Sequence, residues 1–98
     1  MIANFDLVNN FVNCNINGIS NAKMYNGSMH FVGGTLYSYE TAIGQYNKKD
    51  GTFIVNMTKY SRTTSKHRSY LITALTTRKI KYTEVDKVKM GTTNLIKN

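Results

Sequence analysis

Residues 52–75, which read TFIVNMTKYSRTTSKHRSYLITAL, contain the change of pattern on which the fold depends. Their first six residues are mostly apolar or β-branched and follow a Lys-Lys-Asp-Gly turn, so they predict a strand. The Ser and Thr residues after Tyr60 can cap a helix, and the apolar residues that follow recur at helical spacing. We therefore expect one main helix at about residues 64–76, directly after a strand.

The residues before this stretch predict a meander of short strands. Asn26-Gly27 lies between alternating apolar and polar residues, which favours a hairpin turn with positive φ at both positions. A Gly-Gly pair then separates the hairpin from an expected strand at residues 35–39, and another strand is expected at 41–46. With the strand at 52–57, this pattern indicates an antiparallel sheet.

The two ends of the sequence are less clearly patterned. Residues 2–14 fit either a short helix or a strand, and residues 15–18 are typical of a turn. After the main helix, residues 79–83 alternate as a strand does, and residues 85–90 repeat that alternation. Residues 91–98 are expected to form a frayed tail.

Together these patterns predict an α+β fold in a single domain of residues 1–98. A small antiparallel sheet, a meander of about four to six short strands, is expected to pack with the main helix. The chain has 98 residues, which is room for one domain, and no Pro-rich or Gly/Ser-rich linker marks a boundary. An unpaired edge of the meander could also join two copies into a homodimer.

The single cysteine, Cys14, excludes an intrachain disulfide and favours a reducing compartment. A buried apolar role and a reactive or dimer-forming thiol are both open for it. The first 14 residues lack the pattern of a signal peptide, and no run approaches the roughly 20 apolar residues of a membrane span. We therefore expect a cytoplasmic protein that makes no membrane contact.

The positive charge is concentrated in one third of the chain. The formal net charge is +8, and residues 59–90 carry seven of these eight charges while residues 1–58 are neutral overall. Such an asymmetry is typical of a surface that binds a polyanion. A solvated surface that only keeps the protein soluble would show it too.

Residues 60–70 combine hydroxyls, cations and aromatic rings where a strand is expected to give way to a helix. Backbone N–H groups at a helix start, Ser and Thr hydroxyls, and Lys or Arg side chains all bind phosphate oxygens. Ordinary helix capping uses the same residues, so both interpretations stay open. The residues expected to contact nucleic acid or another partner are Arg62, Thr64, Ser65, Lys66, Arg68, Arg78, Lys79 and Lys81.

Aromatic residues are numerous, with seven Tyr and four Phe and no Trp. Tyrosines on a sheet beside a basic helix could stack on unpaired bases, although strand tyrosines more often pack in a core. The candidates for stacking are Tyr25, Tyr37, Tyr39 and Tyr46.

The His, Cys, Asp and Glu residues do not have the spacing of a metal site, so we expect neither a metal nor a cofactor. The enzymatic alternative is a metal-free ribonuclease. In it, His30 and His67 would act as base and acid while Lys66 or Arg68 stabilised the charge that develops on phosphate. This mechanism requires the two histidines to converge. His67 falls on the apolar side of the expected helix, which favours a packed, hydrogen-bonded histidine instead.

Tyr60 to His67, written as Tyr-Ser-x-Thr-Thr-Ser-Lys-His, resembles a motif in small phage and prophage proteins of uncharacterised function. The resemblance covers roughly residues 34–75 and includes a Gly-x-Leu-Tyr-Ser-Tyr stretch at Gly34–Tyr39. Arg62 stands where these proteins are expected to have an apolar residue. The resemblance implies a phage or mobile-element origin. Small phage proteins of this kind are often inhibitors of host machinery, anti-CRISPR proteins among them.

The leading hypothesis is a non-catalytic basic protein that contacts nucleic acid, or a host nucleoprotein complex, through residues 59–90. The alternative is a phage inhibitor of a host defence complex, of the anti-CRISPR type, that acts by binding protein. The metal-free ribonuclease is a remote third hypothesis. A phage-encoded protein would act in the cytoplasm of its bacterial host.

Overall fold

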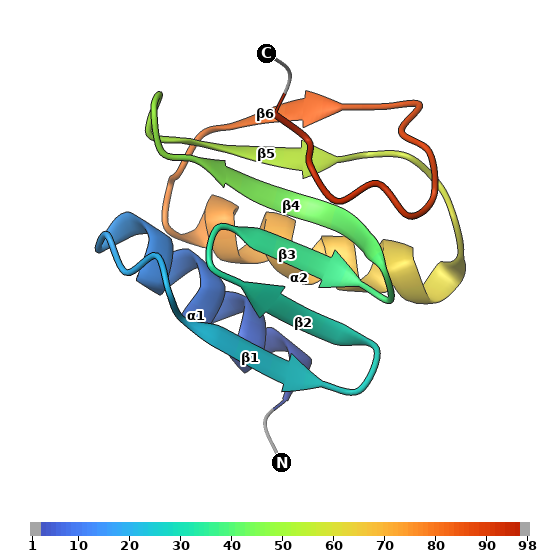
Figure 1. The fold of residues 1–98 in the computed structure, drawn as a ribbon, viewed down its shortest axis with the longest axis horizontal. Helices are drawn as coiled ribbons and strands as arrows, with labels where there is room; N and C mark the ends of the chain where they lie inside the picture. Colours follow the sequence, from blue (N-terminus) through green and yellow to red (C-terminus); the bar gives the residue numbers. More distant parts are fainter. Residues whose placement is uncertain (1–2, 97–98) are drawn as a thin grey trace.

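Two helices cover one face of a six-stranded sheet in the computed structural model, which describes residues 3–96 (Figure 1). The fold is α+β, as the sequence predicts. The helices are α1 (Asn4–Ile16) and α2 (Arg62–Thr77). The strands are β1 (Lys23–Asn26), β2 (Met29–Val32), β3 (Thr35–Ser38), β4 (Thr41–Asn47), β5 (Thr52–Asn56) and β6 (Tyr82–Val85).

The sheet follows chain order from β1 to β6. Neighbouring strands are antiparallel up to β5, as expected for a meander. β6 pairs with β5 in parallel instead, with Tyr82 opposite Phe53. The reason is α2, which carries the chain back along the sheet before β6 begins (Figure 1), and parallel neighbours need such a crossover. The sheet is therefore mixed, and the expectation of a wholly antiparallel sheet was wrong at this last strand.

The ambiguous N-terminal segment is a helix from Asn4 to Ile16, so the described residues contain two main helices where one was expected. The apolar residues of α1 lie on the side that faces the sheet, where Leu7, Val8, Phe11 and Val12 are buried. Periodic burial of this kind favours a helix over a strand. The turn expected at residues 15–18 begins only after Ile16. Neither helix of residues 3–96 is long and apolar enough to cross a membrane.

The first hairpin turns one residue later than Asn26-Gly27 predicts. Asn26 belongs to β1 and pairs with Met29, so the two-residue loop is Gly27-Ser28. Gly27 has φ +61, and Ser28 does not have a positive φ. A loop with positive φ only at its first residue requires glycine at that position alone. The side chain of Asn26 is used elsewhere, because its Nδ2 donates to Oδ1 of Asn4 at 2.7 Å.

The segment after β6 packs on the sheet, so the frayed tail expected from residue 91 onward was wrong for residues 91–96. Leu95 is only 5% exposed and packs with Ala42 and Ile54 on the sheet face opposite the helices. The backbone N–H of Ala42 donates to the carbonyl of Thr92 at 2.8 Å. Residues 97–98 lie outside the described part of the chain.

The strand expected at residues 79–83 begins three residues later, at Tyr82, and the strand expected at 85–90 is absent. Lys79 explains the delay, because it has φ +59 just after α2 and so belongs to the turn that ends the helix. Beyond β6 the chain bends away from β5 instead of continuing as a strand.

The main core lies between the helices and the sheet, and it depends on one close approach. Buried side chains of both helices pack there against Phe31, Phe53 and other apolar residues of the strands. Gly44 of β4 faces Leu71 of α2 so closely that a Cβ atom at residue 44 would overlap Leu71 Cδ2. A glycine in a strand often marks such a close approach.

We expect Gly44→Ala to lower the free energy of unfolding by about 1–3 kcal/mol, because the added methyl forces the buried Leu71 off its packed position. Denaturant unfolding measures the change. Gly34→Ala is the matched control, because a Cβ at residue 34 meets its nearest atoms at 3.5 Å, an ordinary contact. Equal effects of the two substitutions would contradict the close approach.

We expect Leu95→Ala to lower the free energy of unfolding by about 2 kcal/mol, because it leaves a gap over Ala42 and Ile54. Thr93→Ala, at an exposed neighbouring residue, should change it by less than about 0.5 kcal/mol. Chemical denaturation of both variants tests this. A Leu95→Ala variant as stable as Thr93→Ala would mean that the tail does not pack.

Candidate nucleic-acid interface

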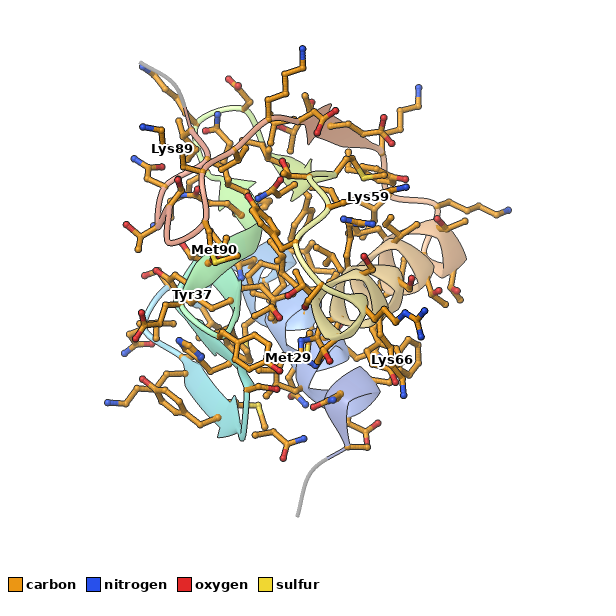
Figure 2. The ribbon with its side chains drawn as sticks, turned by 90° about the vertical axis from the view of Figure 1, so that its right-hand side faces the viewer. Met29, Tyr37, Lys59, Lys66, Lys89 and Met90 are labelled. Atoms are coloured by element: carbon orange, nitrogen blue, oxygen red, sulfur yellow. The ribbon has the colours of Figure 1, made fainter. Side chains whose placement is uncertain are left out.

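The first turns of α2 present cations to solvent. Ser61 caps the helix by accepting a hydrogen bond from the backbone N–H of Thr64 at 3.1 Å. Arg62 and Lys66 are four residues apart, so they lie on one side of the helix, and both are exposed. Lys59 is exposed in the connection before the helix, and Figure 2 shows it on the same side of the view as Lys66. We call Lys59, Arg62 and Lys66 the α2 cation cluster.

The sequence on both sides of this cluster contains no acidic residue. Residues 51–83 contain no Asp or Glu. The cations therefore have no acidic neighbour on β5, on α2 or in the loop that joins them.

The eight residues expected to bind a partner do not form one site. Arg62 and Lys66 lie at the start of α2, whereas Lys79 and Lys81 are exposed beyond its end. The 16 residues of α2 separate the two groups by about 24 Å. The structure thus gives two exposed basic regions at opposite ends of one helix.

Two of the three arginines expected at the site, Arg68 and Arg78, are held by hydrogen bonds to other parts of the fold. Arg68 Nη1 donates to the carbonyl of Thr58 at 3.0 Å, and its Nη2 reaches Oγ of Ser65 at 3.5 Å. Arg78 donates to Oδ1 of Asn9 and to a second asparagine of α1, so it joins the two helices. Guanidinium groups can serve buried carbonyls in this way as readily as they serve phosphates.

Thr64, another expected contact residue, is buried in a polar network at the start of α2. Its hydroxyl is bonded to the hydroxyls of Ser61 and Ser38, at 3.1 and 3.2 Å. Ser38 Oγ also lies 2.7 Å from Nδ1 of His67, which is 2% exposed. Burial, with a smaller contribution from Lys66, lowers the pKa of His67. The expectation of a packed, hydrogen-bonded His67 is confirmed.

An open groove of about 320 Å³ lies beside this network, between the start of α2 and the β3–β4 turn. Tyr39, Met90 and Tyr60 line it, and Tyr39 and Met90 are 53% and 73% exposed. Tyr39 was expected to stack on bases and Tyr60 belongs to the predicted 60–70 stretch, whereas Met90 was not expected at the site and Lys59 was not among the expected contact residues. Met90 adjoins a lysine in the sequence, which is the one signal that could have indicated it.

A second groove shares Tyr39 and Met90 with the first and continues to Tyr25 and His30. There the rings of Tyr25 and His30 are stacked with centroids 5.0 Å apart, and those of His30 and Tyr37 with centroids 4.7 Å apart. These three residues are cross-strand neighbours on β1, β2 and β3. We call them the aromatic ladder.

Tyr46, the fourth tyrosine expected to stack on bases, lines neither of these two grooves. It is half-buried and packs against Phe53, with ring centroids 4.8 Å apart. It belongs to the edge of the main core.

The two histidines lie on opposite faces of the sheet. His67 is under β3, on the helix side, whereas His30 is on the other face within the aromatic ladder. Burial lowers the pKa of His30 as well. The convergence that the ribonuclease mechanism requires is absent. Residues 3–96 also contain no group of three or more His, Cys, Asp or Glu side chains that could hold a metal ion.

Residues 5–87 match a family of unknown function, DUF8033. The chain belongs to this family. The DUF8033 match includes all six strands, all of α2 and all but the first residue of α1, and it ends before Met90. No curated protein and no solved structure matches the chain.

We expect the free energy of unfolding to fall as the pH is lowered below about 6.5. Both histidines have a folded-state pKa below this ordinary value, so the unfolded chain binds protons first and acid favours unfolding. The measurement is denaturant unfolding between about pH 7.5 and 5.5. His67→Gln should flatten the pH dependence, and His30→Gln should remove only the share of His30. An unchanged slope in His67→Gln would contradict the buried, neutral state of His67.

Proposed function

We propose that this protein is a non-catalytic nucleic-acid binder that contacts phosphates through the α2 cation cluster. The observation that supports the proposal is the exposure of Lys59, Arg62 and Lys66 around a helix start, within residues 51–83, which contain no acid. Phosphate contacts by such side chains release counterions from the nucleic acid, and this release drives binding without any sequence preference.

The uneven distribution of charge favours a surface that binds a polyanion over one that only keeps the protein soluble. Residues 1–58 are neutral overall, so solubility does not require the positive charge to gather on one part of the surface. The second basic region, at Lys79 and Lys81, lies about 24 Å away, which corresponds to roughly seven phosphates along one strand of a duplex. One nucleic acid can therefore reach both regions along the exposed side of α2.

A second candidate function is inhibition of a host defence nucleoprotein by a phage-encoded protein. Exposed Tyr39 and Met90, which line a groove that reaches the start of α2, favour it, because aromatic and Met side chains are enriched in protein interfaces. In this case the partner would present an acidic or nucleic-acid surface to the cations. Capture of a host complex that persists after nuclease treatment would favour this candidate over the first.

We expect the protein to bind labelled DNA or RNA at low salt, with affinity that falls steeply as salt is raised. The double variant Arg62→Ala/Lys66→Ala should bind more weakly and lose up to about two units of the logarithmic salt slope. Fluorescence anisotropy at several salt concentrations measures both quantities.

The matched control is Lys48→Ala/Lys49→Ala, which removes the same charge from the β4–β5 turn at the opposite end of the sheet (Figure 1). It should leave the affinity close to that of the unchanged protein. Binding that does not depend on salt, equal losses in both double variants, or no binding at low salt would each contradict the proposal.

A further inference from the structure

The two grooves form one path across the end of the sheet. Tyr39, Thr41 and Met90 line both of them, so these residues form a ridge between the two. On one side of the ridge the path reaches the residues that begin α2, next to the α2 cation cluster. On the other side it reaches Tyr25 and His30 of the aromatic ladder. In Figure 2, Met90 of the ridge lies on the same side of the view as Tyr37 of the aromatic ladder, and Lys66 lies on the other side.

The aromatic ladder is open at one end only. Its rings are nearly parallel, with interplanar angles of 10° and 14°. Tyr37 packs against the cluster of Ala42, Ile54 and Leu95, which closes that end. Tyr25 lies on the edge strand β1 and is 62% exposed, so no strand of residues 3–96 covers the outer side of its ring. A further planar ring can extend this stack at Tyr25.

Tyr39 is held where its ring stays accessible. Its φ of +56 is a left-handed conformation that bulky side chains rarely adopt. Such backbone conformations are found where the surrounding structure imposes them, and they are concentrated at functional sites. Here the turn between β3 and β4 projects the Tyr39 ring into the path instead of burying it.

We propose that the path binds unpaired, single-stranded nucleic acid, with bases stacked on Tyr39 and on the open end of the aromatic ladder. The phosphates then pass the α2 cation cluster. This inference rests on the proposed function and specifies its ligand. Stacking on aromatic side chains requires unpaired bases, because in a duplex the base faces are covered by their neighbours.

The charges along the path agree with this orientation. Glu40 lines the groove on the ladder side, where it would repel phosphate but could accept a hydrogen bond from a base amino group. Lys59 and Arg62 adjoin lining residues on the α2 side, where they would attract phosphate. The bases are thus expected toward the ladder and the backbone toward α2. A protein partner with an apolar segment would not need this separation of charges.

The test compares three labelled ligands of equal length. They are a single-stranded DNA oligonucleotide, the corresponding duplex, and a single strand in which every nucleotide is abasic. The abasic strand keeps the phosphates but removes the bases. At low salt the single strand should bind at least tenfold more tightly than the abasic strand, because each stacked base adds to its affinity.

Two variants remove the rings without disturbing the fold. Tyr39→Asn suits the left-handed backbone conformation, which Asn adopts more readily than Tyr, and Tyr25→Leu keeps an apolar side chain over His30. Each should lower affinity for the single strand by about tenfold and leave the abasic strand unaffected. Tyr25→Phe should restore binding, because it restores the ring. Phe5→Leu, which removes an exposed ring on α1, is the matched control and should have no effect.

The outcomes separate this inference from the function on which it rests. Equal binding of the single strand and the abasic strand, or full binding by Tyr39→Asn and Tyr25→Leu, would overturn the inference while the phosphate-binding function stood. The exposed rings would then be expected to contact a protein partner. If none of the three ligands bound at low salt, the proposed function itself would be wrong.

Discussion

The arrangement of the candidate site depends on the buried hydrogen bonds that join the end of β3 to the start of α2. Ser38 is the last residue of β3, and its hydroxyl meets both Thr64 and His67 of α2. These groups are almost fully buried, and hydrogen bonds between buried groups hold well-defined positions because leaving one unpaired costs about 1–3 kcal/mol. Tyr39 follows Ser38 directly, so the same bonds place it in the groove beside the start of α2.

A second set of contacts attaches the C-terminal segment to this junction. The hydroxyl of Tyr60 donates to the carbonyl of Val88, and the backbone N–H of Val88 donates to Oγ1 of Thr58 at 2.9 Å. These bonds hold the chain close to the start of α2 just before Met90. Because Met90 forms the ridge with Tyr39, the shape of both grooves depends on a segment that is distant in sequence from the helix.

The sequence predicted the elements that depend on residues close together in the chain, and it did not predict those that depend on distant contacts. The middle strands and α2 follow from turn residues, alternation and a capping serine, all of which act over a few residues. The parallel pairing of β6 and the packing of Leu95 depend on contacts with distant strands, so no local pattern indicates them. The N-terminal segment was ambiguous because its Phe and Val residues satisfy both periods, and burial against the sheet decides for a helix.

Only some of the cations expected at the candidate site are free to contact a partner, and the groups within reach of each side chain explain the difference. Arg62 and Lys66 are exposed to solvent, as a contact surface requires. Arg68 and Arg78 have the same chemistry, but carbonyl and amide oxygens lie within their reach. The first turn of α2 contains no acid, although acids there usually stabilise a helix by about 0.3–1 kcal/mol each, and it is flanked by cations instead. An arrangement that opposes the helix dipole is expected where function requires it, and a bound phosphate would offset this local repulsion.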